Sequence, residues 1–471
     1  MQKQENTAMT QTLLQMGMPV AIGMLMTFLF QLVDSYFIGQ LGAKELAVIS
    51  FSFPVYLLLL GFFMGAASGV ATAIGKAIGE NNSEKAKILS SMAHLAFICF
   101  TILLGILGIY TITPVFTILG ASSTQISLVA NYMLPLYSGM FLLVGGLVGN
   151  SVLLAKSLTK RATIIMGIGG VVNLLLDYLF IFGYGGVIPR MELAGAAWAT
   201  VISWFVIFVL MIFTVWRQDL FSAKLLLPKY WQLGYLQEIV QLSSPAILSQ
   251  VMTPLSVAVI TRLLANFGGE YVAAYGVVSR IESLGLTGIL SLSVIITPLG
   301  AQYFGGHRQD KLDAMVALAG RMTVYWGIGF YLCILVFSQQ IIAIFTDDLG
   351  VIAQGQIYLR FVGISYPLFG LFLITGSFLN GVYQASRSLQ LTLLKNLLCT
   401  VPFAILAAQY NYKVLCLAIA CANIAGFILA ARYLRSWMRE KSSTLLQVSP
   451  LFDYWSDMRN LSLFLWRKIK L

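Results

Sequence analysis

The sequence predicts an all-α integral membrane protein with 12 transmembrane helices in two parallel-repeated six-helix lobes around a central cleft. The first observation is composition: 59% of the 471 residues are hydrophobic and only 10% are charged, whereas roughly a quarter of the residues of a soluble protein are charged. The second is the length of the apolar runs, and the third is a repeat of landmarks at one offset. This composition also excludes a disordered chain, a disulfide scaffold and a nucleic-acid binder.

Twelve apolar runs are long enough to cross a membrane, since a helix needs roughly 20 residues to span a hydrocarbon core of about 30 Å. Their continuity favours helices over the alternating strands of a β-barrel. The first run is too long for a signal peptide and shows no cleavage pattern, so we expect it to be retained. The expected spans are 12–39, 46–74, 91–118, 127–153, 164–185, 195–216, 237–266, 272–303, 314–345, 352–383, 389–409 and 413–434.

Basic residues set the orientation of these spans, because cytoplasmic loops carry an excess of Lys and Arg. With the N-terminus inside, 21 basic residues lie on the cytoplasmic side, and only Lys44, Arg190 and Lys413 lie outside. We therefore expect a multi-pass protein of the plasma (inner) membrane with both termini in the cytoplasm. The net charge of +11 then reflects topology and not an acidic partner.

Landmarks of the first half recur 226 residues later. The matched pairs are Pro19 with Pro245, Gly42 with Gly268, Gly79 with Gly305 and Arg161 with Arg387. An even number of spans in each unit makes the two halves parallel. We predict an N-terminal lobe at 1–216, a cytoplasmic linker at 217–236, a C-terminal lobe at 237–437 and a basic amphipathic tail at 438–471. The basic residues of the tail favour a place on the inner leaflet, and a disordered tail is the alternative.

Three acidic residues lie inside the spans and away from their ends: Asp34, Asp177 and Glu282. A carboxylate at mid-bilayer costs roughly 2.5–3.5 kcal/mol, so such residues usually mark ion or proton paths. The first six spans contain no basic residue, which disfavours a structural ion pair for the two aspartates. Asn173 lies four residues before Asp177 and shares its helix face.

Burial and a second carboxylate favour the neutral form of such an acid, so Asp34 and Asp177 can exchange a proton. They can also bind Na⁺, since carboxylate, amide and hydroxyl oxygens are hard ligands. Glu282 is interpreted differently, because Arg262 on the preceding span can reach it and Arg280 is two residues away. We expect a structural ion pair there.

The most specific segments are VDSYFIGQLGAKELA at 33–47, AIGENNSEKAK at 77–87 and NLLLDYLFIFGYGGVIPRMELAGAAWATVIS at 173–203. They resemble the multidrug and toxic compound extrusion (MATE) family of bacterial-type secondary transporters. The resemblance implies antiport of amphipathic, often cationic drugs or dyes in exchange for H⁺ or Na⁺, and so a role in antibiotic resistance.

By motif match, the resemblance assigns proton or cation coupling to residues of the N-terminal lobe. These are Asp34, Asp177, Asn173, Thr200 and Tyr132, with Na⁺ expected at Asp34, Asn173, Asp177 and Thr200. Members with a C-terminal site carry carboxylates where this chain has Thr253 and Phe369. The resemblance is therefore closer to the DinF-like branch, which has an acidic site in the N-terminal lobe.

Pro19 is a hinge candidate, because it lies fifteen residues before Asp34 on the first span and a proline permits a helix to bend. Our hypothesis is that protonation of Asp34 bends this helix and expels the cargo. The repeated Pro245 leaves open that the proline belongs to the scaffold of both halves.

An alternative function is a flippase for a lipid-linked oligosaccharide or a cell-wall precursor. Such substrates carry phosphates, which basic side chains bind. Five basic residues lie within the expected spans or at their edges and leave this alternative open: Arg262, Arg280, Arg321, Arg360 and Lys395. We expect no enzyme, since no phosphate loop, nucleophile–base pair or metal cluster is found in the sequence. The expected partners are small molecules and membrane lipids, with no cofactor besides the coupling ion and no structural metal. The expected state is a monomer.

Overall fold

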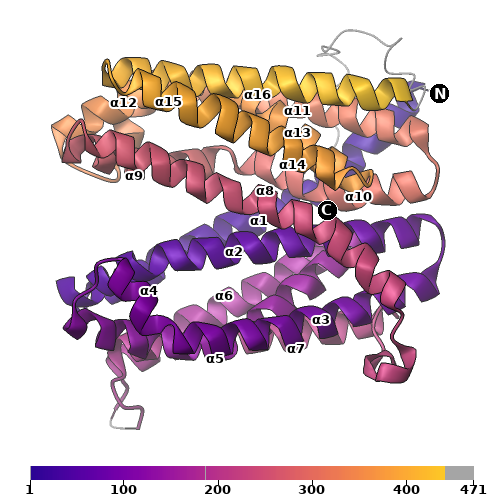
Figure 1. Cartoon of the computed structure of the whole chain (residues 1–471), viewed down its shortest axis with the longest axis horizontal. Helices are drawn as coiled ribbons and strands as arrows, with labels where there is room; N and C mark the ends of the chain where they lie inside the picture. Colours follow the sequence, from indigo (N-terminus) through magenta and orange to yellow (C-terminus); the bar gives the residue numbers. More distant parts are fainter. Residues whose placement is uncertain (1, 186, 441–471) are drawn as a thin grey trace, which may run out of the picture. The chain divides into compact units, whose positions relative to one another are not determined.

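The computed structural model describes residues 2–185 and 187–440. Within these ranges the regular structure is helical, apart from one isolated bridge between Tyr184 and Ile188, and Figure 1 shows the helices in sequence colours. The predicted all-α class is confirmed. The predicted tail at 438–471 lies outside the described residues except for its first three positions.

Long helices fill the first half of the chain (Figure 1). They are α1 (Gln2–Gly39), α2 (Ala43–Gly79), α3 (Ser83–Tyr110), the short α4 (Ile112–Ile118), α5 (Ser123–Ala155), α6 (Thr159–Phe182) and α7 (Glu192–Arg217). Two short 3₁₀ helices, η1 (Ala223–Leu226) and η2 (Pro228–Tyr230), occupy the predicted linker.

The second half is divided into more pieces. They are α8 (Leu233–Ala265), α9 (Gly269–Gly285), α10 (Thr287–Gly305), α11 (Gln309–Ala343), α12 (Leu349–Gly363), α13 (Tyr366–Gly381), α14 (Ala385–Leu393), the π-helix η3 (Leu394–Thr400), α15 (Val401–Ala407) and α16 (Tyr412–Glu440).

The count of membrane spans agrees with the sequence. The described chain has eleven helical segments long and apolar enough to cross a membrane, and twelve when α12 and α13 count as one bent span. Exposed Leu103, Ile106 and Leu107 on α3 show the apolar outer surface that a lipid-facing helix requires. The multi-pass prediction is confirmed at this level.

The continuous span predicted at 352–383 is wrong in one respect. α12 and α13 meet at a bend of 60°, and Pro367 stands in the first turn of α13. Proline has no N–H to donate and disfavours helical geometry in the residue before it. Asn423 of α16 donates a 2.9 Å hydrogen bond to the buried Ser365 hydroxyl at this break, so the bend is stabilised by a neighbouring helix.

The helices form two compact units. The described residues of Ile22–Ile247 form one, and the described residues up to Ala21 together with those from Leu248 to Glu440 form the other. The predicted lobes at 1–216 and 237–437 divide the chain at the linker. The compact units divide it differently, because the first part of α1 belongs with the C-terminal helices and the first part of α8 belongs with the N-terminal helices. α1 and α8 each contribute to both units.

Packing explains this exchange in each unit separately. Met9, Leu13 and Met16 of α1 belong to a buried cluster of the unit that contains α10 and α11. In the other unit, α8 lies against α2 so closely that a Cβ at Gly65 or Gly69 would meet the α8 backbone. The two glycines therefore permit the start of α8 to pack as part of the N-terminal unit.

The linker lies against α3 within the N-terminal unit. The Lys87 ammonium is 2.6 Å from the Asp219 carboxylate, and the Ser222 amide donates to the Ser91 hydroxyl at 3.1 Å. The ring of Phe221 meets buried His94 edge to face at 5.6 Å between centroids. These contacts give the linker a defined place on its own unit.

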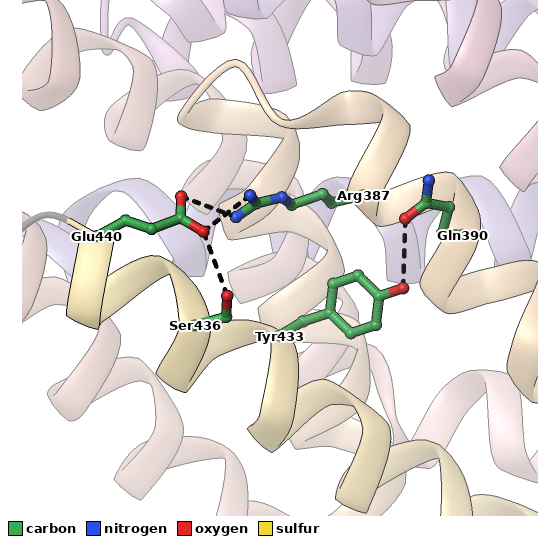
Figure 2. Close-up of polar contacts among 5 residues, drawn as sticks. All are labelled: Arg387, Gln390, Tyr433, Ser436 and Glu440. Atoms are coloured by element: carbon green, nitrogen blue, oxygen red, sulfur yellow. Dashed lines mark hydrogen bonds and ion pairs between the residues drawn. The ribbon is translucent and has the colours of Figure 1, made fainter.

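In the other unit, an ion pair joins α14 to the end of α16. Figure 2 shows Arg387 donating to both carboxylate oxygens of Glu440, at 3.1 and 2.8 Å. Ser436 donates to Glu440, and Tyr433 donates to Gln390 beside them. Arg387, which the charge pattern assigns to the cytoplasmic side, thus also connects two helices.

Candidate functional site

The two aspartates predicted from the sequence come together in the N-terminal unit. Asp34 lies on the second half of α1, and Asp177 lies on α6, where its side chain is only 1% exposed. The carboxylates are close enough to interact electrostatically. The Oδ1 atoms of both are buried without a hydrogen-bond partner in the described chain.

No ion pair of Asp34 or Asp177 is found among the described residues. A buried carboxylate without a partner is costly, and a basic side chain is the usual protein-borne solution. Among the described residues no basic side chain neutralises either carboxylate. This is the chemical property that distinguishes the site from a structural ion pair.

Two tyrosines complete the electrostatic neighbourhood of the aspartates. Tyr132 of α5 lies within electrostatic range of both carboxylates, and Tyr56 of α2 lies within range of Asp34. Tyr132 was expected from the resemblance, whereas Tyr56 was missed. The chain has 21 tyrosines, and hydropathy does not distinguish one that faces a carboxylate from one that faces lipid.

Asn173 and Thr200 also lie together, on α6 and α7. The Asn173 amide donates to the Thr200 hydroxyl at 3.5 Å, the outer limit of a hydrogen bond. Thr200 in turn donates to the carbonyl of Ala196 at 3.0 Å. The role of both side chains in coupling stays a prediction.

The α6–α7 connection explains why this segment carries so specific a sequence. Gly183 ends α6 with a φ of +77°, a left-handed conformation that favours glycine. A Cβ at Gly195 would meet the Phe180 backbone, so glycine there permits α7 to pack closely against the end of α6. The close packing places Asn173 opposite Thr200.

Metal-ligand clusters of three or more His, Cys, Asp or Glu side chains are absent from the described residues. The aspartate pair supplies two carboxylates only. A proton needs no more than one of them, while Na⁺ would also use neutral oxygens such as those of Asn173, Thr200 or the tyrosines. The site is therefore chemically suited to a proton or a monovalent cation.

Glu282 lies in the other unit, in a cluster of tyrosines. Its Oε1 accepts a 2.8 Å hydrogen bond from the Tyr366 hydroxyl, and Tyr275 and Tyr358 lie within electrostatic range. The described residues contain no ion pair between Glu282 and either predicted arginine, Arg262 or Arg280, and both arginines are exposed. Residues two apart on a helix face different directions, which explains why Arg280 does not pair with it.

Pro19 stands inside α1, which runs as one helix from Gln2 to Gly39. Gly17 nearby faces Leu292 and Ile295 in the unit that contains the start of α1. The division between the compact units falls two residues after Pro19. The proposed hinge therefore has a suitable position, and its bending stays a prediction.

Comparison with known proteins recovers the internal repeat. The MatE family model matches residues 19–179 and again residues 245–406. The two matches begin 226 residues apart, the same offset that the landmarks show. The duplicated unit predicted from the sequence is thus a unit of this family.

Similar proteins carry two kinds of names. The chain is 32% identical over 436 residues to the FAD transporter of Shewanella oneidensis, covering 89% of this chain and 94% of that protein. It is 26% identical to the probable multidrug resistance protein YoeA of Bacillus subtilis, over 75% of this chain and 77% of that one. The crystal structure of the Vibrio cholerae MATE transporter VcmN in the bent form matches with a TM-score of 0.86 and 26% identity, over 92% of this chain and 99% of that one.

Proposed function

Because the chain belongs to the MatE family, we propose that it is a secondary active exporter that exchanges a small amphipathic solute for H⁺ or Na⁺. The proposal is supported by one observation above all. Asp34 and Asp177 lie within electrostatic range of each other, each with a buried Oδ1 that has no hydrogen-bond partner in the described chain. We assign these two side chains the role of the coupling pair.

The coupling follows from the cost of two neighbouring buried charges. Two carboxylates that interact in a low-dielectric site are not both ionised at low cost, so binding of a proton or Na⁺ stabilises the pair. Tyr132 and Tyr56 hydroxyls can donate to an ionised carboxylate or accept from a protonated one. The occupied and empty pair therefore favour different hydrogen bonds around α1.

Cation binding at Asp34 can drive export only if the cation-bound and cation-free forms of the protein bind the cargo with different affinities. Our scheme assigns that difference to α1, which carries both Asp34 and Pro19. Cation binding favours a bent α1 and low cargo affinity, and cation release favours a straight α1 and high affinity. An inward cation gradient therefore drives export of the cargo in this scheme.

Two classes of cargo are candidates. Amphipathic, often cationic drugs or dyes fit the membrane spans of the first half, which carry acids and no internal base. A flavin dinucleotide is the second candidate, favoured by the 32% identity to a protein named FAD transporter. The flippase alternative rests on the in-span bases, of which Arg321 and Lys395 are buried.

The test is transport by the purified full-length protein in proteoliposomes, with a pH gradient and a Na⁺ gradient imposed separately. Ethidium and FAD serve as cargo. We expect one gradient to drive transport of at least one cargo, and Asp34→Asn and Asp177→Asn to reduce it at least tenfold. Asp310→Asn, which changes an exposed aspartate at the start of α11, is the matched control. Full transport by the Asp34→Asn protein would disprove the coupling scheme.

A further inference from the structure

Lys395 is a lysine in the middle of a membrane-spanning segment. The segment Ala385–Ala407 is long and apolar enough to cross a membrane, and Lys395 lies ten residues after its start. At 1.5 Å per residue this is about 15 Å, close to the centre of a core about 30 Å thick. Ionisable residues at this depth are rare, and they usually face a partner or a pathway.

The side chain of Lys395 is 8% exposed and lies among aromatic rings. Its Nζ is 5.1 Å from the ring centroid of Phe369 and 5.4 Å from that of Phe372, two rings stacked 15° from parallel. Its aliphatic stem passes Gly426 of α16, where a Cβ would meet the lysine Cγ. Glycine therefore keeps open the space that the lysine occupies.

An ammonium group has three N–H donors, and none of them has an acceptor among the described residues. The described chain also pairs no carboxylate with Lys395, and its electrostatic neighbour is the Cys399 thiol. Cation–π contacts stabilise the charge in part, but they do not replace hydrogen bonds. The described chain thus offers the Lys395 ammonium aromatic rings but neither a hydrogen-bond acceptor nor a carboxylate.

The local backbone around Lys395 is also unusual. Leu394–Thr400 form a π-helix, and the Thr400 hydroxyl donates to the Lys395 carbonyl at 3.1 Å across the wide turn. A π-turn lowers the regularity of a helix and is frequent at functional sites. Here it carries the buried lysine and the buried Asn396 beside it.

We propose that Lys395, with Phe369, binds a phosphate-bearing aromatic cargo of the flavin nucleotide type. The ammonium contacts a phosphate, and the half-buried Phe369 ring offers an apolar surface to the planar heterocycle. A cationic cargo is repelled at the same place. This inference rests on the proposed export function and deepens it, since it assigns the anionic cargo to one compact unit and the coupling cation to the other.

The test is equilibrium binding to the full-length protein in phosphatidylcholine nanodiscs, followed by flavin fluorescence. FAD carries phosphates, while riboflavin has the same ring system without them. We expect the wild type to bind FAD at least tenfold more tightly than riboflavin. Lys395→Gln should remove this preference by weakening FAD binding alone, and Lys395→Arg should retain it.

Lys311→Gln is the matched control, because Lys311 makes a cation–π contact with Tyr303 near the start of α11. It should bind FAD as the wild type does. Equal FAD affinity of wild type and Lys395→Gln would overturn the proposal. Competition of phosphatidylglycerol with FAD at Lys395 would also overturn it, because the lysine would then hold a lipid phosphate.

A stability measurement distinguishes a binding lysine from a packing one. If Lys395 is a binding residue, its buried charge destabilises the protein without ligand. Lys395→Met should then raise the Tm of the ligand-free protein and abolish the Tm increase that FAD causes in the wild type. A lower Tm together with unchanged FAD affinity would assign Lys395 to packing. These readouts do not depend on transport, so the coupling scheme at Asp34 can fail while this proposal stands, and the reverse.

Discussion

The Tyr366 hydroxyl donates a 2.8 Å hydrogen bond to Glu282, which is 84 positions earlier in the chain. Tyr366 is 2% exposed and begins α13 directly after the break in the span. The bond thus joins α9 to the first turn of a broken helix. Its donor is a neutral hydroxyl, so Glu282 is stabilised here by a tyrosine and not by an arginine.

Tyr366→Phe removes that donor and leaves the Glu282 carboxylate without it in a buried cluster. Loss of one partner of a buried hydrogen bond costs about 1–3 kcal/mol, so we expect a Tm about 1–3 °C lower in detergent. Tyr331→Phe is the control, since the Tyr331 hydroxyl donates to the Arg360 carbonyl from an exposed position. A Tm for Tyr366→Phe equal to that of the control would show that Glu282 needs no such donor.

Asp177→Asn should abolish transport and raise stability. A neutral amide has no buried charge to desolvate, and functional sites commonly sacrifice stability in this way. We expect a gain of about 1 kcal/mol, or roughly 1 °C in Tm for a chain of 471 residues. The measurement is a thermal melt beside the proteoliposome assay. An unstable variant with full transport would contradict both expectations.

Tyr56→Phe tests the site residue that the sequence did not reveal. The Tyr56 hydroxyl lies within electrostatic range of Asp34, and in our scheme it donates to the ionised carboxylate. Loss of such a donor costs about 1 kcal/mol, so transport should fall roughly threefold to tenfold without a change in expression. Tyr132→Phe should behave in the same way. Tyr184→Phe, at an exposed position in the α6–α7 connection, serves as the control, and an equal loss there would remove Tyr56 from the site.

Gly69→Ala tests the close approach of α8 to α2. The new Cβ would meet the Ser243 backbone, and forced overpacking typically costs about 1–3 kcal/mol. Gly276→Ala in α9 has open space around its Cβ position and should be neutral or stabilising by up to about 1 kcal/mol. Relative to the wild type, the free energy of unfolding should fall for Gly69→Ala and should stay unchanged or rise for Gly276→Ala. Equal changes in the two variants would show that α8 does not need Gly69.

Local properties of the chain determined the class, the twelve spans and the repeat. Hydropathy and charge act residue by residue, so a run of apolar side chains is recognisable without any partner. The candidate acids Asp34 and Asp177 were recognisable for the same reason, because a carboxylate inside an apolar run is costly wherever the helix packs. Pro367 signalled a break at 364–365, but a hydropathy average over 352–383 concealed it.

Tertiary structure decided what depends on which helix faces which. Examples are the assignment of half-helices to the two units, Tyr56 of α2 within electrostatic range of Asp34, and Tyr366 in place of an arginine at Glu282. Lys395 illustrates the difference most directly. The sequence by itself showed a lysine inside a span, and only the packing of α13 and α16 around it showed that its charge is buried against aromatic rings with no anionic partner in the described chain.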